Sequence, residues 1–372
     1  MRLLDRYLLR ELLIPLIYCL GGFLAFWITF DLFTTLDTFQ ANHLNPADVA
    51  EYYALRLPEL MVTVLPVALL LGLLYALSNH ARHHELVAIR AAGVSLWRMC
   101  APYLGVGIAA SLGLFWLNEI WAPDSSDAAR QILTRHIQVE NQAEKEWRRN
   151  VNFRNERDDR FWTIAAFHLP THTMHKPSAD WRTPDGVRHQ LFAENGRRLG
   201  GVWTFQNVLL FVYQPANPGV PERFQTNEMA FPELTETPEQ ILSEIKISSV
   251  SNVLATKRLH FSLREIANYR GLHPSLRGRD FALVNTQFHG RLATPWTCLV
   301  VVLIAIPFGI LPGRRNVFVG VAASIFICFA FFILSKYTLA LGTNGSLTPW
   351  LAAWLPNLVF GIGGITMTSR LQ

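Results

Sequence analysis

Six apolar segments, three toward each end of the 372-residue chain, constrain its fold more than any other feature of the sequence. A helix needs roughly 20 apolar residues to cross the hydrocarbon core of a bilayer. The segments of about this length are residues 12–30, 60–78, 99–117, 292–311, 317–334 and 350–368. Charged residues make up only 16% of the chain and gather in its middle. The sequence therefore predicts a membrane α-helical bundle of six transmembrane helices, with a water-exposed domain inserted between the third and the fourth.

Arginines beside these segments predict which way the helices cross, because short cytoplasmic loops of membrane proteins carry an excess of Lys and Arg. One side of the predicted bundle would hold Arg2, Arg6, Arg10, Arg82, Arg90, Arg98, Arg314, Arg315 and Arg370. The other side would hold only Arg56 and Lys336 in or beside its short loops. We therefore expect both termini in the cytoplasm of a bacterium. The inserted domain would then lie in the periplasm, outside the inner membrane.

The polar middle of the chain, residues 123–280, is predicted to be one domain between two membrane parts, 1–122 and 281–372. A polar helical stretch is expected at 127–148. Segments rich in aromatic and β-branched residues predict strands at 160–169, 188–193, 201–213 and 222–229. Helical pieces are expected to begin near Thr237 and Ser262. The strands fit an antiparallel β-jellyroll or sandwich. Their alternation favours a filled sandwich over a β-roll that receives an amphiphile, and it leaves both alternatives open.

No motif for nucleotide hydrolysis is present, and we predict neither catalytic residues nor a cofactor. A P-loop contains a Gly-Lys pair, and no Gly in this chain is followed by Lys. His80, His83, His84 and Glu85 come nearest to a metal motif, but a solvated polar loop explains them better than a zinc site with its further ligands. The formal charge of +5 does not indicate a nucleic-acid partner.

The loop at 80–98, between the second and third apolar segments, has the pattern of a short docking helix. Good helix formers fill 85–92, and Gly93 follows as a C-terminal cap, with Arg90 in the last turn. Leu86 and Ile89 supply apolar contacts, and Glu85 is the one acid among arginines and histidines. Two interpretations stay open. The helix either lies on the lipid surface or acts as a coupling helix that docks to a cytoplasmic ATPase.

Several segments resemble, in order, those of the LptF/LptG permease family, the paired membrane subunits of the lipopolysaccharide-exporting ABC transporter. The loop segment ELVAIRAAGVSLWRM at 85–99 is similar to the family's equivalent loop. LLDRYLLREL at 3–12 resembles the stretch before the first span, and FHGRLATPWTCLVVVLIAIPFGI at 288–310 the entry into the fourth. Pro349-Trp350 and Trp354-Leu355-Pro356-Asn357 are similar to its last helix. The resemblance covers essentially the whole chain.

The resemblance implies three protein partners and one substrate. A paralogous permease subunit would form a heterodimer with this chain, a cytoplasmic ABC ATPase dimer would drive the pair, and a bitopic protein would form a periplasmic bridge. Lipopolysaccharide would be the transported lipid. The residues implied for the ATPase contact are Glu85, Leu86, Ile89, Arg90 and Gly93, with Glu85 as the charged anchor.

The same resemblance implies that the first and fifth helices form lateral gates for the lipid. The aromatic candidates are Phe23, Phe26, Trp27, Phe30, Phe326, Phe329 and Phe332, for which ordinary packing is an equal alternative. Because lipid A is anionic, Arg56, Arg291 and Lys336 are candidate phosphate ligands. Asp31 and Asp37, at the outer end of the first helix, depart from the basic residues that an anionic lipid would favour.

The function that best fits the sequence is therefore a non-catalytic permease subunit. It would extract lipopolysaccharide from the inner membrane and pass it to the bridge toward the outer membrane. The alternative is a membrane anchor or scaffold whose periplasmic domain binds a partner without transport. An ion-coupled carrier is disfavoured by the scarcity of charges in mid-span. Gly105, Ala109 and Gly113 would let another helix approach closely, first of all within this subunit and secondly at a dimer face.

Overall fold

The computed structural model describes residues 3–121, 125, 128–129, 132–133, 135, 146–215, 219–251, 261–310 and 317–370. The chain divides into two compact units. The helical unit is Met1–Arg135 with Gly278–Gln372, and the β domain is His136–Arg277. Most of the helix expected at 127–148 lies outside the described residues, as do Arg2, Arg314 and Arg315.

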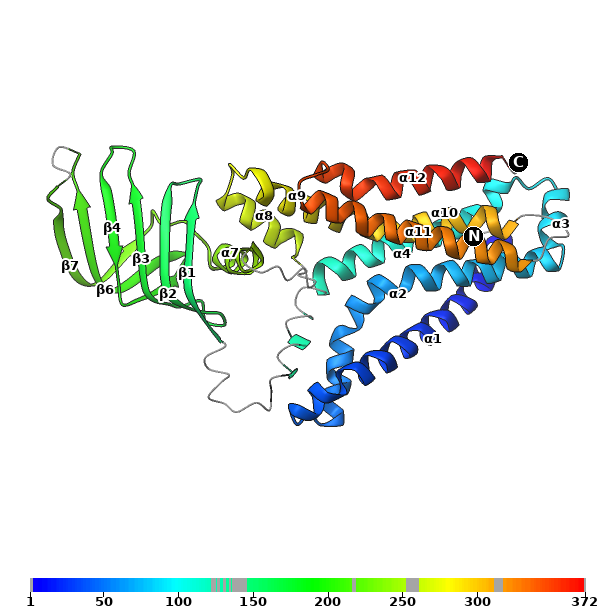
Figure 1. Cartoon of the computed structure of the whole chain (residues 1–372), viewed down its shortest axis with the longest axis horizontal. Coiled ribbons are helices and arrows are strands. Elements are labelled where there is room, and N and C mark those ends of the chain that lie inside the picture. The colour runs from blue at the N-terminus through cyan, green and yellow to red at the C-terminus, as the bar shows by residue number, and fades with distance from the viewer. Residues whose placement is uncertain are drawn as a thin grey trace. The chain divides into compact units, whose positions relative to one another are not determined.

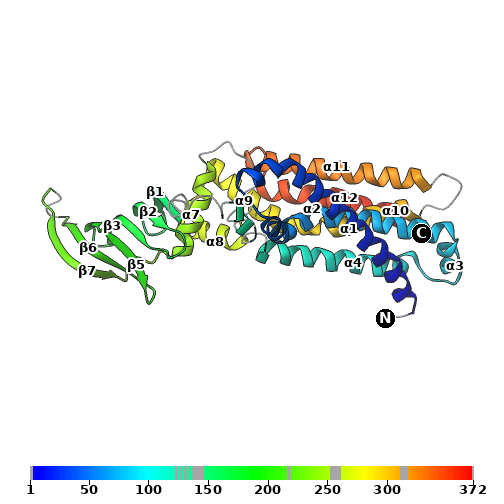
Figure 2. The same cartoon turned by 90° about the horizontal axis from the view of Figure 1, so that it is seen from below.

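Among the described residues, six helical segments are long and apolar enough to cross a membrane, which confirms the predicted bundle. They are α1 (Leu3–Ala41), α2 (Pro46–Arg82), α4 (Leu96–Trp116) with the π-helical turn η1 (Leu117–Trp121), α9 (Gly278–Ala293) joined through the 3₁₀ turn η2 (Thr294–Trp296) to α10 (Thr297–Ile310), α11 (Val317–Thr343) and α12 (Pro349–Ser369). The start of α1, the end of α12 and the short helix α3 (Glu85–Ala91) lie at one end of this unit (Figures 1 and 2).

Helices α2 and α10 form the centre of the helical unit, where side chains meet backbone at close range. Leu69, Leu73 and Leu77 of α2 are fully buried in one cluster with residues of α4 and α10. A Cβ atom built on Gly309 of α10 would lie 2.6 Å from Cβ of Leu77, so only glycine fits there. A Cβ on Gly72 would likewise come within 3.0 Å of the backbone of Leu16 in α1. Small residues thus set the spacing of these helices, as is usual in membranes.

The far end of the α1–α2 hairpin lies apart from α11 and α12 (Figure 1), and the buried rings of Phe39, Tyr52 and Tyr53 pack together there. α1 has 39 residues and α2 has 37, many more than a membrane crossing needs. Arg56 of α2 donates to Asp31 of α1 over 2.8 Å, and Tyr53 donates to the same carboxylate over 3.1 Å. Asp31, which departed from the expected basic pattern, is therefore a partner of Arg56 in the hairpin.

The β domain holds one antiparallel sheet, so the fold class of a helical bundle with an inserted β domain is confirmed. Its strands are β1 (Trp147–Asn155), β2 (Arg160–His168), β3 (Met174–Arg182), β4 (Arg188–Phe192), β5 (Asn195–Leu199), β6 (Val202–Tyr213) and β7 (Glu222–Phe231). β4 and β5 pair in one continuous register with both β3 and β6, so they act as a single interrupted strand. The described strands form a meander in one sheet, where a sandwich would need two.

A line of left-handed residues crosses this sheet, and we call it the crease. Asn150, Lys176 and Asn207 have φ angles of 56°, 46° and 51°. One row of cross-strand pairs runs through Arg149, Ala166, His175, Asn195 and Gln206. The three left-handed residues come directly after Arg149, His175 and Gln206 in the chain. The register of the strand pairs is the same on both sides of the crease, so no strand gains an extra residue there. In β3 and β6 the alternation of buried residues shifts by one at the left-handed residue.

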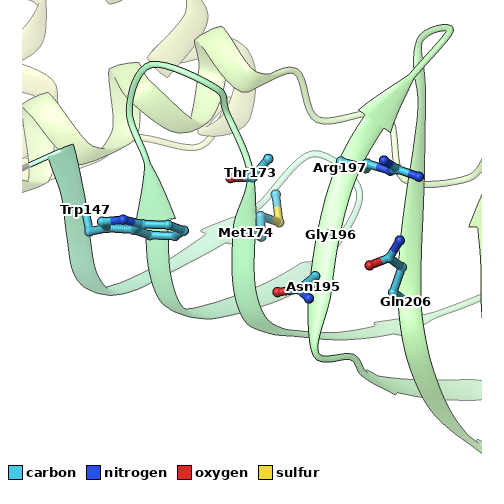
Figure 3. Close-up of a pocket in the computed structure, with 7 residues that line it drawn as sticks. All are labelled: Trp147, Thr173, Met174, Asn195, Gly196, Arg197 and Gln206. Atoms are coloured by element: carbon cyan, nitrogen blue, oxygen red, sulfur yellow. The ribbon is translucent and has the colours of Figure 1, made fainter. Parts of the chain in front are cut away.

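Burial along β6 shows the effect of the crease. Trp203 and Phe205 are buried on one side of Asn207, and Val208 and Leu210 on the other. The buried residues have odd numbers before Asn207 and even numbers after it. The bend therefore keeps both halves of the strand facing the same interior. The strands curve strongly in Figure 3. Residues of α7 (Pro238–Ser251) and α8 (Leu263–Leu272) complete this interior: Ile241, Ile245 and Leu272.

Candidate functional site

The loop that carries α3 has clear boundaries in the structure. His84 takes a left-handed conformation with φ of 59° just before α3, and Gly93 does so with φ of 84° just after it. The Gly93 amide donates to the carbonyl of Arg90 over 2.9 Å, and the Val94 amide to that of Ile89 over 3.4 Å. Gly93 therefore sits where the sequence placed a helix cap, and a β-carbon there would strain the backbone. Ser95 then caps α4, accepting from the Arg98 amide.

Glu85 is held by two residues of its own chain. Its Oε2 atom accepts from the hydroxyl of Tyr7 in α1 over 3.0 Å and lies 2.7 Å from Nδ1 of His80 in α2. Burial alone would raise the pKa of Glu85, but the hydrogen bonds from His80 and Tyr7 outweigh it and lower that pKa below 4.5. Glu85 is thus a carboxylate at neutral pH. Sequence reasoning missed Tyr7, because only the fold brings it to α3.

The apolar side chains of α3 were expected to contact the ATPase, and the structure places them differently. Leu86 is buried and Ile89 packs against the main core of the helical unit, so both face their own bundle. The exposed positions are Val87, at 58%, together with Ala88 and Ala91. Arg90 is exposed as well. An amphipathic pattern identifies an apolar stripe, but it does not say whether that stripe meets a partner or the chain itself.

The aromatic candidates divide by exposure. Phe26 and Phe30 of α1 are 67% and 59% exposed, and their rings stack with centroids 6.5 Å apart. On α11, Phe329 is 63% exposed. Phe23 and Trp27 are only partly exposed, and Phe332 packs against buried core residues. Phe326 is 74% exposed and continues the outward face of α11 with Ile333 and Tyr337. The outward aromatics can meet lipid or another helix.

The cationic candidates lie in three different environments. Arg56 is bound to Asp31 and lies 3.8 Å from Glu59, so its charge is largely compensated. Arg291 is only 8% exposed, donates to the carbonyl of Asn118 over 2.9 Å, and lies 3.6 Å from Glu119. Lys336 is exposed near the end of α11 and, among the described residues, shows no ion pair or hydrogen bond. The structure thus brings none of the three together with another.

Small residues on α4 face outward. A Cβ built on Gly105 or Gly113 would meet nothing within 4 Å, and Ala109 between them is exposed. The preferred expectation, packing within this subunit, is therefore wrong for this stripe. The small residue of α4 that does pack inside is Gly107, where a Cβ would lie 3.1 Å from the side chain of Val302.

The β domain has a pocket of about 230 Å³ beside the crease (Figure 3). It is lined by Trp147, Thr173, Met174, Asn195, Gly196, Arg197 and Gln206. Gly196 lies flat against Phe205, whose ring atoms would be 2.8 Å from an added Cβ. Sequence analysis missed this pocket because its residues come from strands far apart in the chain. No grouping of three or more His, Cys, Asp or Glu suited to a metal ion occurs in the described ranges.

Candidate spans on both sides of an inserted antiparallel β domain define a multi-pass membrane protein. The family model described as lipopolysaccharide export system permease LptF/LptG matches residues 6–370. The chain therefore belongs to the LptF/LptG family, which consists of permease subunits of a lipopolysaccharide exporter. A search of the curated proteins finds no match.

Proposed function

We propose that this chain is one of two related permease subunits in an inner-membrane ABC transporter that extracts lipopolysaccharide. A cytoplasmic ATPase dimer would dock on α3 and hydrolyse ATP, and this subunit would be non-catalytic. Both termini would be cytoplasmic. The observation that carries the proposal is the family match over residues 6–370, almost the entire chain. The exposed aromatic faces of α1 and α11 support it, since they can face lipid and the second subunit.

An open inner face of the β domain supports a route for the lipid toward a bitopic bridge protein. Phe224 and Met229 of β7 pair with Leu210 and Phe205 of β6, so their side chains lie on the same face as those buried residues. They are nevertheless 51% and 37% exposed. The interior of the bent sheet is thus accessible along β7. This favours the β-roll that receives an amphiphile over the filled sandwich.

The docking part of the proposal is tested by purifying the tagged chain from its native membrane in mild detergent. We expect an ATPase and a second six-helix subunit in stoichiometric amounts. Val87→Asp puts a charge on the outward face of α3 and should remove the ATPase while the second subunit stays. Glu85→Arg should also remove it. Asp37→Arg makes the same charge change on an exposed residue at the far end of α1, and should retain both partners.

Arrival of the wild-type chain without an ATPase would overturn the transporter proposal. Purification with periplasmic proteins alone would favour the alternative of a membrane anchor or scaffold that binds a partner and moves nothing. Retention of the ATPase by Val87→Asp would place the docking surface elsewhere on the chain.

A further inference from the structure

The two carboxylate oxygens of Glu85 have different surroundings. Oε2 accepts both bonds, from the hydroxyl of Tyr7 over 3.0 Å and from Nδ1 of His80 over 2.7 Å. Oε1 accepts no hydrogen bond from any described residue, and the Glu85 side chain is 32% exposed. One oxygen therefore faces the chain's own helices, and the other can accept a bond from a donor outside the chain.

His80 is bound to Glu85 in a fully buried position. Its side chain is 0% exposed. Since a carboxylate can only accept, the proton of this hydrogen bond lies on Nδ1. Nε2 is buried and has no hydrogen-bond partner within the described part of the chain. The ring of Tyr7 lies 5.7 Å from the imidazole ring. Glu85 is thus the polar contact that orients this buried imidazole, and the imidazole in turn fixes Glu85 against α2.

A second contact ties α1 to the other end of the loop. Asp5, two residues before Tyr7, forms an ion pair of 2.9 Å with Arg98 in the first turn of α4. The first two turns of α1 are therefore held on both sides of α3. Leu8, Leu12 and Leu16 are buried directly after these contacts. Between Leu16 and Phe39 no described residue of α1 is buried, and partly buried side chains such as Leu20, Phe23 and Ile28 make the contacts of this stretch.

We propose that Glu85 is a clasp between the docking helix and α1, with Tyr7 and His80 as its positioning residues. Through Oε2 the clasp fixes α3 to the start of α1. A displacement of α3 is then passed to the start of α1. The transport role of the clasp rests on the proposed function, whereas its intramolecular contacts do not.

Hydrogen exchange on the purified full-length chain tests the contacts directly. Tyr7→Phe removes one hydroxyl and keeps the ring. We expect amide exchange in α3 and in the first two turns of α1 to become about threefold to tenfold faster, as the loss of a hydrogen bond to a partly exposed carboxylate predicts. Tyr18→Phe is the matched control, because Tyr18 lies on the same helix, is 77% exposed and has no hydrogen bond to a described residue. Equal exchange in both variants would overturn the clasp, whether or not an ATPase is bound.

The coupling role is tested in the reconstituted complex by the amount of lipopolysaccharide released per ATP hydrolysed. Tyr7→Phe should keep the ATPase bound and active but lower this ratio about threefold or more, whereas Tyr18→Phe should leave it unchanged. In hydrogen exchange on the chain without the ATPase, adding Tyr7→Phe to Glu85→Ala should make the start of α1 exchange no faster, because the contact between the two residues is already broken. An unchanged ratio in Tyr7→Phe, with faster exchange, would limit the clasp to a structural role. Loss of the ATPase from the wild type would instead contradict the proposed function.

Discussion

The inner spans α2 and α10 differ sharply from the outer spans α1 and α11, although all four are strongly apolar. In the most apolar 18-residue window of each, 61% of residues are buried for α2 and 78% for the segment with α9 and α10. The figures are 11% for α1 and 22% for α11. Hydropathy therefore identifies what enters the membrane, and burial identifies what is left to meet lipid or a partner. The outer pair coincides with the helices that the family resemblance assigns to the lipid gates.

The largest effect is expected where α12 packs directly against the backbone of the inner span α10. A Cβ on Gly364 of α12 would lie 2.6 Å from the carbonyl oxygen of Leu303 in α10, which cannot move aside as a flexible side chain would. We expect Gly364→Val to lower the free energy of unfolding by about 3 kcal/mol or more. Gly363→Val is the matched control, because a Cβ there meets nothing within 4 Å. Thermal unfolding of the two purified variants in detergent measures the difference. Equal melting temperatures would contradict the expected difference between the two glycine positions.

A smaller effect is expected from two of the three cations that the sequence grouped together as candidate phosphate ligands. Replacing the buried Arg291 by Met removes its hydrogen bond to the Asn118 carbonyl and its charge beside Glu119, which should cost about 2–3 kcal/mol of unfolding free energy. Lys336→Met should leave stability unchanged and weaken capture of lipopolysaccharide. Thermal melting and a lipid-binding assay on the same preparations separate the two results. A destabilised Lys336→Met would show that α11 is more firmly packed than its exposure indicates.

A pH effect is expected in the β domain, where His273 links α8 to its neighbours. Burial alone would lower the pKa of His273, but its bond to Glu244 and the charge of Glu156 outweigh it and raise that pKa above 6.5. The stability from His273 is therefore complete below pH 6.5 and is lost as pH rises through the raised pKa. A hydrogen bond from Ser275 lowers the pKa of Glu156 below 4.5, so its contribution is lost on acidification.

Amide exchange of Leu263–Leu272, corrected for intrinsic rates, should therefore be slowest between about pH 4.5 and 6.5 and faster at pH 8. His273→Gln should remove the alkaline change and keep the acidic one. An alkaline change that persists in His273→Gln would show that another group is responsible. The helical unit should show no matching change at pH 8, which would confine the alkaline response to the β domain.

The spans, the inserted β domain and the loop at α3 could be predicted from the sequence, because the length of apolar runs and the turn residues are local properties. The sequence did not predict the direction in which side chains on those elements face. Leu86 and Ile89 were expected to face a partner and instead pack on the chain's own core. Tyr7 was not considered as a partner of Glu85, because 78 residues separate them. The crease was equally hidden, since Asn150, Lys176 and Asn207 form a line only after the strands pair.

The most direct test of the central claim is a photo-crosslinking comparison of the two classes of span in cells. A photoreactive amino acid would replace Phe329 or Phe26, which are 63% and 67% exposed, and in a matched variant Val301 of α10, which is 0% exposed. We expect the positions on α11 and α1 to crosslink to lipopolysaccharide and the position on α10 not to do so. Crosslinking at Val301, or its absence at both outer positions in variants that still assemble, would contradict it.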